Sequence, residues 1–400
     1  MKVRAAGEPH LTYCTNIHAG ESWPEVRRTI EGPVTAVKRA VAADVPFGVG
    51  LRLSARAAME LTDGSELADF RALLGDRGMY VFTINGFPYG AFHATRVKEA
   101  VYLPDWLDDA RLVYTTTLAE LLAALLPSEM ALGTVSTVPG AFRDRVGSTA
   151  DVEAMGDRIV RAAAAFHELR ERTGKTIALA LEPEPFCHFE TIAETVAFFE
   201  QRLFSQQAVA RFAALTRTSN SLADEALHRH LGVCFDACHM AVEFEEPRAA
   251  IGRLRSAGIS IGKIQISAGL QVDFARSDVL APLRAFADDV YLHQVVERRR
   301  GGFVRYLDLP QALAAADPSD LERVWRIHFH VPVFRDSLGP FSGTQPYLRE
   351  LLQILRDTAA SPHLEVETYT WDVLPEEYRR DGVVAAVIRE LEWVKKELGS

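Results

Sequence analysis

Short apolar runs alternate along the chain with longer stretches in which apolar residues recur every three to four positions. The short runs have the length of buried strands, and the longer stretches have the period of helices that bury one face. The nine strand candidates are Leu11–Asn16, Phe47–Leu53, Tyr80–Ile84, Leu132–Ser136, Ile177–Leu181, Gly232–Phe235, Ile261–Ile266, Ile327–Val333 and Leu364–Thr368. Strands that alternate with helices indicate βα units and a largely parallel sheet.

The helical stretches lie between these runs. They are Trp23–Ala43, Ser65–Leu74, Leu112–Leu126, Asp151–Thr173, Thr191–Leu203, Arg248–Ala257, Leu348–Asp357 and Val383–Leu398. No linker rich in Gly, Ser or Pro divides the chain, so we expect one domain over residues 1–400, an α/β protein of the (β/α)8 TIM barrel type. Nine strand candidates exceed the eight of such a barrel. One of them is therefore an edge strand, an inserted strand or no strand at all.

Residues from about 269 to 324 are the best candidate for an insertion. Val290–Val296 and Phe303–Leu307 flank a basic stretch, Glu297–Gly302. Two strand-like runs around a short segment that contains glycine are typical of a β-hairpin. We therefore expect an inserted hairpin with a solvated basic tip. This insertion accounts for part of the surplus over the roughly 250 residues of a typical barrel.

The composition limits the function further. The chain has 400 residues, of which 48% are hydrophobic and 24% charged, which is ordinary for a soluble globular protein. Its net charge of −10 argues against nucleic acid as the main partner. We find no apolar run of membrane-spanning length and no signal peptide, and the four cysteines are sparse. We expect a cytoplasmic protein that acts on a small molecule, and a homo-oligomer stays open.

Polar residues gather where the last predicted strands end, which is where a parallel barrel carries its reactive groups. They are Glu182 and Glu184, Asp236 and His239, Gln265, His328 and His330, and Glu365 and Glu367. Residues two apart on a strand share a face. His330 and Glu367 are thus the members of their pairs nearer the barrel mouth.

A buried charge at a strand end needs a partner, and a divalent metal ion is one. Two or three carboxylates with one imidazole suit Mn²⁺, Mg²⁺, Co²⁺ or Zn²⁺. Taken singly, a strand-end Glu is explained by a neighbouring Lys or Arg, and a lone His by a hydrogen bond in the core. The coincidence of Glu, Asp-x-x-His, His and Glu at four of the last five strands favours a shared metal.

A second polar group follows the first strand: Tyr13, Asn16, His18 and Glu21. These side chains face either a substrate at the barrel mouth or only their own loop. The loop alternative has support, since Glu21-Ser22 precedes Trp23-Pro24 and proline suits the first turn of a helix.

The strand ends resemble the xylose isomerase-like superfamily of sugar isomerase and epimerase TIM barrels, which also holds apurinic endonucleases. Leu181–Pro185 is similar to the Glu-Pro-Lys-Pro run of xylose isomerases. Asp236–Met240 resembles the Asp-x-x-His-Met of ketose 3-epimerases, and His328–Val331 with Arg335 resembles their His-x-His-Val followed by Arg. Within the superfamily, the opening His10–His18 followed by Glu21-Ser22-Trp23 is similar to the EboE family, named for metabolite traffic.

The resemblance implies a ligand set and roles for its neighbours. The metal ligands would be Glu182, Asp236, His330 and Glu367, and His239 and Arg335 would hold substrate oxygens. Glu182 and Glu367 would also move the proton. Two departures matter: Glu184 replaces a lysine of the isomerase motif, and the strand with Gln265 lies between the Asp and His strands. Gln265 is therefore an alternative ligand to His330. We expect Glu184, Asn16, His18 and Tyr13 on the substrate side.

These observations favour a metal-dependent isomerase or epimerase of a sugar or polyol-like metabolite, working by proton transfer through an enediolate. One alternative is a non-catalytic or weakly catalytic metabolite-binding protein on the same barrel. Another is a metal-dependent phosphodiesterase of the endonuclease branch, against which the net charge of −10 counts.

Overall fold

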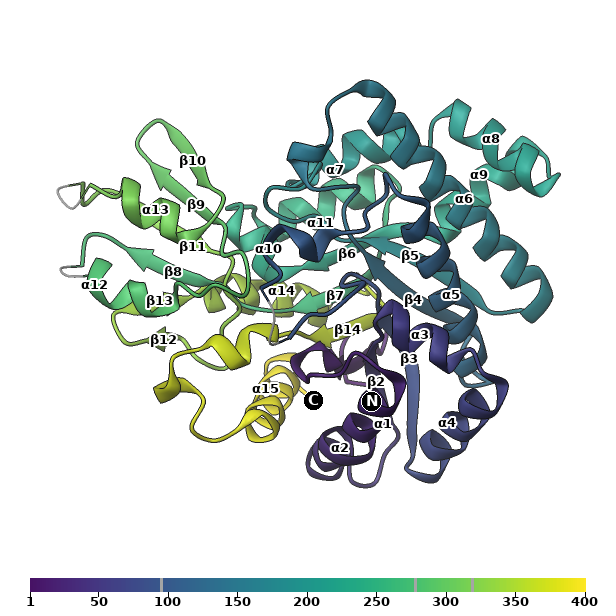
Figure 1. The fold of residues 1–400 in the computed structure, drawn as a ribbon, viewed down its shortest axis with the longest axis horizontal. Coiled ribbons are helices and arrows are strands. Elements are labelled where there is room, and N and C mark those ends of the chain that lie inside the picture. Colours follow the sequence, from purple (N-terminus) through teal and green to yellow (C-terminus); the bar gives the residue numbers. More distant parts are fainter. Residues whose placement is uncertain (94–95, 277–278, 318–319) are drawn as a thin grey trace.

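The computed structural model describes residues 1–93, 96–276, 279–317 and 320–400. At its centre lies a sheet of eight parallel strands in the order β1-β14-β7-β6-β5-β4-β3-β2 (Figure 1). The strands are β1 (His10–Tyr13), β2 (Phe47–Arg52), β3 (Met79–Asn85), β4 (Leu132–Thr137), β5 (Thr176–Leu181), β6 (Leu231–Asp236), β7 (Ser260–Ile266) and β14 (His363–Val366). A parallel bridge between Cys14 and Gly50 links the two edge strands, so the barrel is nearly closed. The predicted TIM barrel is confirmed.

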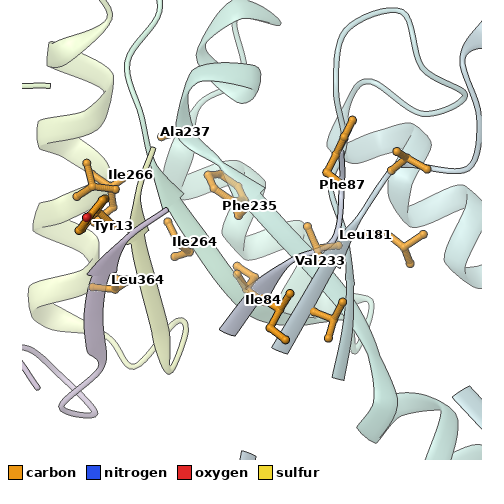
Figure 2. Packing of buried hydrophobic residues seen from close by; sticks show 14 of the residues in the cluster. Tyr13, Ile84, Phe87, Leu181, Val233, Phe235, Ala237, Ile264, Ile266 and Leu364 are labelled. Atoms are coloured by element: carbon orange, nitrogen blue, oxygen red, sulfur yellow. The ribbon is translucent and has the colours of Figure 1, made fainter. Parts of the chain in front are cut away.

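The barrel closes where a glycine lets β1 and β2 approach. A Cβ atom on Gly50 would lie 2.2 Å from Oε1 of Glu365 and 2.5 Å from the backbone oxygen of Tyr13. The strands themselves are buried along almost their whole length, as expected for a parallel sheet covered by helices. Figure 2 shows apolar side chains such as Leu181, Val233 and Ile264 packed between the strands and the surrounding elements.

The helices lie around the outside of the barrel (Figure 1). They are α1 (Trp23–Thr29), α2 (Thr35–Val41), α3 (Ala55–Leu61), α4 (Gly64–Asp76), α5 (Asp109–Leu125), α6 (Thr149–Thr173), α7 (Ile192–Phe198), α8 (Gln206–Thr216), α9 (Asn220–His230), α10 (Ala237–Val242), α11 (Pro247–Ser256), α14 (Gln345–Asp357) and α15 (Val383–Leu398). The longest, α6, starts at the capping side chain of Ser148 and ends at Gly174, whose φ is 72°. None of the helices formed by the described residues combines the length and apolar character that crossing a membrane requires.

Short 3₁₀ and π turns complete the barrel. They are η1 (Thr15–Ile17), η2 (Ile30–Val34), η3 (Lys98–Tyr102), η4 (Arg143–Arg145), η5 (Phe199–Leu203), η7 (Tyr369–Val373) and η8 (Glu376–Tyr378). The predicted helix Trp23–Ala43 is interrupted by η2, a π turn that contains Pro33. Of these turns, η3 and η7 contribute residues to the hollow that Glu182 and Glu367 also line.

A second sheet stands beside the barrel, and all of its strands come from the chain between β7 and α14 (Figure 1). It is antiparallel with the order β10-β9-β11-β8-β13-β12. Its strands are β8 (Leu270–Asp273), β9 (Val295–Arg299), β10 (Gly302–Tyr306), β11 (Val324–Ile327), β12 (Ser337–Leu338) and β13 (Phe341–Gly343), with α12 (Leu280–Leu283), η6 (Arg284–Phe286) and α13 (Leu309–Ala315) between them. The expected inserted hairpin is present as β9 and β10, but its first strand is Val295–Arg299 and not Val290–Val296. Arg298 and Arg299 of the expected basic tip therefore lie in the strand.

The prediction of a barrel strand over Ile327–Val333 is wrong. Only Ile327 belongs to a strand, and that strand, β11, pairs antiparallel with β8 and β9 in the second sheet. The residues after it run without a ladder toward the barrel mouth, where the backbone N–H of Val331 donates to the oxygen of Ala268. Phe329 and Val333 are completely buried. The other residues from Ile327 to Val333 are buried as well, so the apolar run that predicted a strand marks burial without strand pairing.

Candidate metal centre

Three carboxylates meet at the carboxyl ends of the barrel strands. Glu182 follows β5, Asp236 ends β6 and Glu367 follows β14. One carboxylate oxygen from each lies within 4.8 Å of the others, and all three side chains are buried. These strands are not all neighbours in the sheet, so the curvature of the barrel is what brings the three groups together.

Surrounding residues hold two of these carboxylates, Asp236 and Glu367, each by one oxygen. Oδ1 of Asp236 accepts hydrogen bonds from the backbone N–H of His239, at 2.9 Å, and from the hydroxyl of Ser267, at 2.8 Å. Oε1 of Glu367 accepts from the side-chain amides of Asn16, at 2.7 Å, and Asn85, at 2.9 Å. These two carboxylates are therefore oriented before any ligand arrives.

Their protonation is strongly affected by this environment. Burial raises the pKa of Glu182 and of Glu367 well above the usual range, and repulsion from the neighbouring carboxylates raises it further. Burial also raises the pKa of Asp236. Three such groups in one buried site need either protons or a cation to offset their charge.

His330 adds a nitrogen to the same place. Its Nδ1 lies 3.0 Å from the backbone oxygen of Glu367, which only accepts, so this nitrogen carries the proton and Nε2 carries a lone pair. Nε2 of His330 has no hydrogen-bond partner among the described residues, and the same is true of Oε2 of Glu182 and Oδ2 of Asp236. One ligand atom each of His330, Asp236 and His239 lies within 4.8 Å of the others.

These unpartnered atoms fit a divalent cation. They are buried, carry free electron pairs and come from two carboxylates and one imidazole, which is the donor set that Mg²⁺, Mn²⁺, Co²⁺ and Zn²⁺ accept. The Nδ1–H of His330 also donates a hydrogen bond to a backbone carbonyl, which is the usual arrangement of a metal-ligating histidine.

Gln265 lies beside the site but presents the wrong atom. It is opposite Asp236 in the register of β6 and β7. Its Oε1 lies 3.2 Å from the thiol of Cys234, which donates to it, and its buried Nε2 has no partner. An amide NH₂ is not a metal ligand. The geometry therefore favours His330 over Gln265.

Two further histidines face each other across the cavity. Nδ1 of His239 donates to the backbone oxygen of Pro183, and Nδ1 of His328 donates to Oε1 of Gln294. The amide orientation of Gln294 is fixed because its Nε2 donates to the backbone oxygen of Pro185. Both Nε2 atoms therefore carry lone pairs, and they lie 3.1 Å apart. The hydroxyl of Tyr369, at 3.3 Å, can donate to His328, which leaves His239 in need of a donor.

Glu184 is the centre of a neighbouring network. Its Oε1 accepts from the hydroxyl of Tyr102 at 2.8 Å, and Tyr102 in turn accepts from Nε2 of Gln294 at 2.8 Å. Burial raises the pKa of Glu184 to about 8. Glu184 is thus largely protonated at neutral pH and can donate as well as accept.

Below the carboxylates, a buried ion pair fills the inside of the barrel. Nζ of Lys263 lies 2.7 Å from Oε2 of Glu365, and neither side chain is exposed. Glu365 is two residues before Glu367 and shares its face of β14, as the strand alternation predicts. The ion pair with Lys263 offsets the charge of Glu365 inside the barrel.

The remaining predicted substrate contacts are spread more widely. Asn16 lines the cavity, but Tyr13 and His18 do not; they hydrogen-bond each other at 3.0 Å. The guanidinium of Arg335 lies over the rings of Phe334 and Tyr378, away from the cavity lining. Substrate contacts by Tyr13, His18 and Arg335 stay predictions that this geometry does not support.

The site opens into a hollow with an empty volume of about 510 Å³, part of it continuous with solvent. Its lining includes residues that the sequence did not single out, among them Tyr102, Tyr291 and Tyr369. They lie in the irregular segments η3 and η7 and in the loop before β9, where no periodic pattern marks them. The sequence could have indicated Asn85, which holds Glu367, because an asparagine at the end of a buried strand is unusual.

Comparison with solved structures identifies the class of fold. A xylose isomerase-like TIM barrel protein from Mycobacterium smegmatis, in complex with magnesium, matches with a TM-score of 0.53 and 11% identity over 98% of each chain. A xylose isomerase domain protein from Planctomyces limnophilus (TM-score 0.48, 12% identity, 98% of each chain) is also similar. So is the 3-keto-D-glucoside 4-epimerase of E. coli, with a TM-score of 0.42 and 13% identity over 97% of this chain and 99% of that one.

The chain therefore has the xylose isomerase-like TIM barrel fold. At these identities the likeness concerns the fold alone. No protein-family profile and no curated protein matches the chain. The similarity to the EboE family stays a prediction from the opening residues.

Proposed function

We propose that the protein is a divalent-metal-dependent isomerase or epimerase of a sugar or polyol-like metabolite. The observation that carries this proposal is the cluster of Glu182, Asp236 and Glu367, with His330 beside Asp236. Buried atoms of Glu182, Asp236 and His330 have no partner in the described protein. These four residues would hold the metal. When bound, the metal would withdraw electron density from substrate oxygens and make the C–H next to a carbonyl more acidic.

Glu182 and Glu367 are the proposed proton carriers. Both line the cavity, and they come from strands on different sides of the barrel mouth. One carboxylate would take the proton from carbon and the other would return it, which is how the configuration at that carbon changes. Two amides hold Glu367, so its orientation is fixed while it exchanges a proton.

His239 would bind a hydroxyl group of the substrate. Burial lowers its pKa to about 3, so the ring is neutral, and its Nε2 is an acceptor. A neutral acceptor recognises an O–H donor, whereas an oxyanion needs a donor. The geometry thus favours a substrate hydroxyl over the oxyanion as the partner of His239.

Hydrogen exchange at carbon tests this proposal without knowledge of the natural substrate. The Mn²⁺-supplemented protein is incubated in D₂O with a panel of ketohexoses and inositol ketones, and deuterium at the carbon next to the carbonyl is followed by NMR. We expect exchange with the unchanged protein and at least a roughly 100-fold loss in Glu182→Gln.

Glu390→Gln is the matched control, because Glu390 is a buried carboxylate outside the cavity lining. Its exchange rate should equal that of the unchanged protein. Metal binding without exchange on any ketone would instead support a metabolite-binding protein on the same barrel. Exchange that persists in Glu182→Gln would contradict the proton-transfer role.

A further inference from the structure

The cavity over the candidate metal centre has two chemically different halves. Its floor consists of carboxylates, imidazoles and the two asparagines described above. The apolar part of its lining, which we call the roof, consists of Phe87, Phe92, Val97, Val101, Tyr291 and Leu292. The roof residues come from the loop after β3, from η3 and from the loop before β9.

The polar groups of the roof are already occupied by the protein. The hydroxyl of Tyr291 donates to the backbone oxygen of Phe92 at 3.1 Å. Lys98 has the one ammonium group in the described lining, and its Nζ donates to the backbone oxygens of Asp288 and Tyr291 and to Asp308 at 2.7 to 2.9 Å. The roof therefore presents rings and methyl groups to the cavity, and no free cation among the described lining residues.

Part of the roof is a small core of its own. Phe92, Val97 and Tyr291 form a hydrophobic cluster apart from the main core, and Val101 packs against it. Backbone hydrogen bonds tie its two segments together, from Val97 N–H to the oxygen of Val290 at 2.9 Å and from Lys98 N–H to the same oxygen at 3.1 Å. Residues 193 positions apart thus combine into one apolar surface, which lines the same hollow as the acidic floor.

This arrangement selects against charged substrates. A phosphate or carboxylate group usually needs a cationic side chain or a set of free backbone N–H groups when it leaves water. The described roof has no free cationic side chain. The backbone N–H groups of Phe87, Phe92, Val97 and Tyr291 already donate within the protein. Moving an apolar group from water into contact with the roof, in contrast, lowers the free energy.

We propose that the substrate is an uncharged hydroxy-carbonyl compound that carries an apolar group. Its oxygen-bearing end contacts the floor, and its apolar group contacts the roof. The proposal rests on the proposed function for the chemistry at the floor. It adds the substrate class, because it excludes sugar phosphates and sugar acids. It also requires an apolar group, which a short-chain sugar lacks.

Three probes that share one hydroxy-ketone test the substrate class by calorimetry with the Mn²⁺-supplemented protein. They are 2-hydroxyacetophenone, which carries a phenyl ring, dihydroxyacetone, which carries no apolar group, and dihydroxyacetone phosphate. We expect 2-hydroxyacetophenone to bind at least about tenfold more tightly than dihydroxyacetone, since ring burial favours it. Dihydroxyacetone phosphate should bind most weakly.

A roof variant with a matched control locates the effect. Val101→Thr keeps the shape of the side chain and makes it polar, so the affinity for 2-hydroxyacetophenone should fall about threefold or more while that for dihydroxyacetone stays within twofold. Val113→Thr makes the same change on the exposed surface of α5, where Val113 is 61% exposed, and should alter neither affinity.

The tightest binding by dihydroxyacetone phosphate, equal binding of the two uncharged probes, or no binding of 2-hydroxyacetophenone would each overturn the substrate class. These results are independent of the proposed function, whose failure shows as absent metal binding or absent exchange at carbon. A correct ranking without exchange would keep the substrate class and contradict the isomerase.

Discussion

At the scale of single residues, three buried carboxyl groups form the candidate metal centre. The sequence places Glu182, Asp236 and Glu367 at strand ends, and in the structure their oxygens converge. It did not identify the partners that orient them, such as Asn16 and Asn85 on Glu367, because those contacts join positions 351 and 282 residues apart. Local patterns carry no record of such distant pairs.

A buried carboxyl group away from the site gives a prediction about pH. Glu390 accepts hydrogen bonds from the hydroxyl of Thr368 at 2.7 Å and the backbone N–H of Val333 at 3.1 Å, and burial raises its pKa to about 7. Between its unfolded value of 4.5 and about 7, the folded protein binds more protons at this residue than the unfolded chain. The contribution of Glu390 to stability is therefore present below pH 4.5 and is lost as the pH rises to about 7.

Glu390→Gln should remove this dependence, because glutamine keeps the acceptor oxygen and does not titrate. Unfolding by urea in the presence of a chelator, at pH 5, 6, 7 and 8, measures it. The stability of the variant relative to the unchanged protein should rise by up to about 3 kcal/mol across this range. Parallel stability curves for the two proteins would contradict the raised pKa.

At the scale of elements, the strand and helix periods predict the barrel well but miss two kinds of segment. Helices α8 and α9 went unpredicted because they bury chiefly alanines, such as Ala208 and Ala223, whose weak hydrophobicity hides the period. The segment from His328 to Val333 shows the opposite error, since all of its residues are buried although they form no strand. His330 of this segment nevertheless lies close to Asp236 at the carboxyl end of β6.

The closure of the barrel between β1 and β2 gives a prediction about an element contact. Gly50→Ala would place a Cβ against Glu365 and the backbone of Tyr13, so the strands must move apart. We expect a loss of about 3 kcal/mol in the free energy of unfolding. Gly75→Ala, in α4 with nothing within 4 Å of the added Cβ, should instead stabilise the protein slightly. Equal stabilities in thermal and urea unfolding would show that β1 and β2 do not meet as described.

At the scale of the whole molecule, the second sheet takes part in the site. Glu182, Asp236 and Glu367 belong to the barrel, whereas His330 comes from the chain that returns from the second sheet. A metal held by all four would join the two parts of the molecule. The formal net charge of −10 counts the three carboxylates of this buried group. That residues 1–400 form a single domain stays a prediction.

The most direct test of the account is the binding of Mn²⁺ to chelator-treated protein, measured by calorimetry. We expect saturable binding by the unchanged protein and a loss of at least about 100-fold in affinity in His330→Leu. Gln265→Leu is the control, because it replaces a side chain about as large as His330 beside the site. Its affinity should be unchanged. Failure of the unchanged protein to bind Mn²⁺, Mg²⁺, Co²⁺ or Zn²⁺, or a loss in Gln265→Leu with none in His330→Leu, would contradict the metal centre described here.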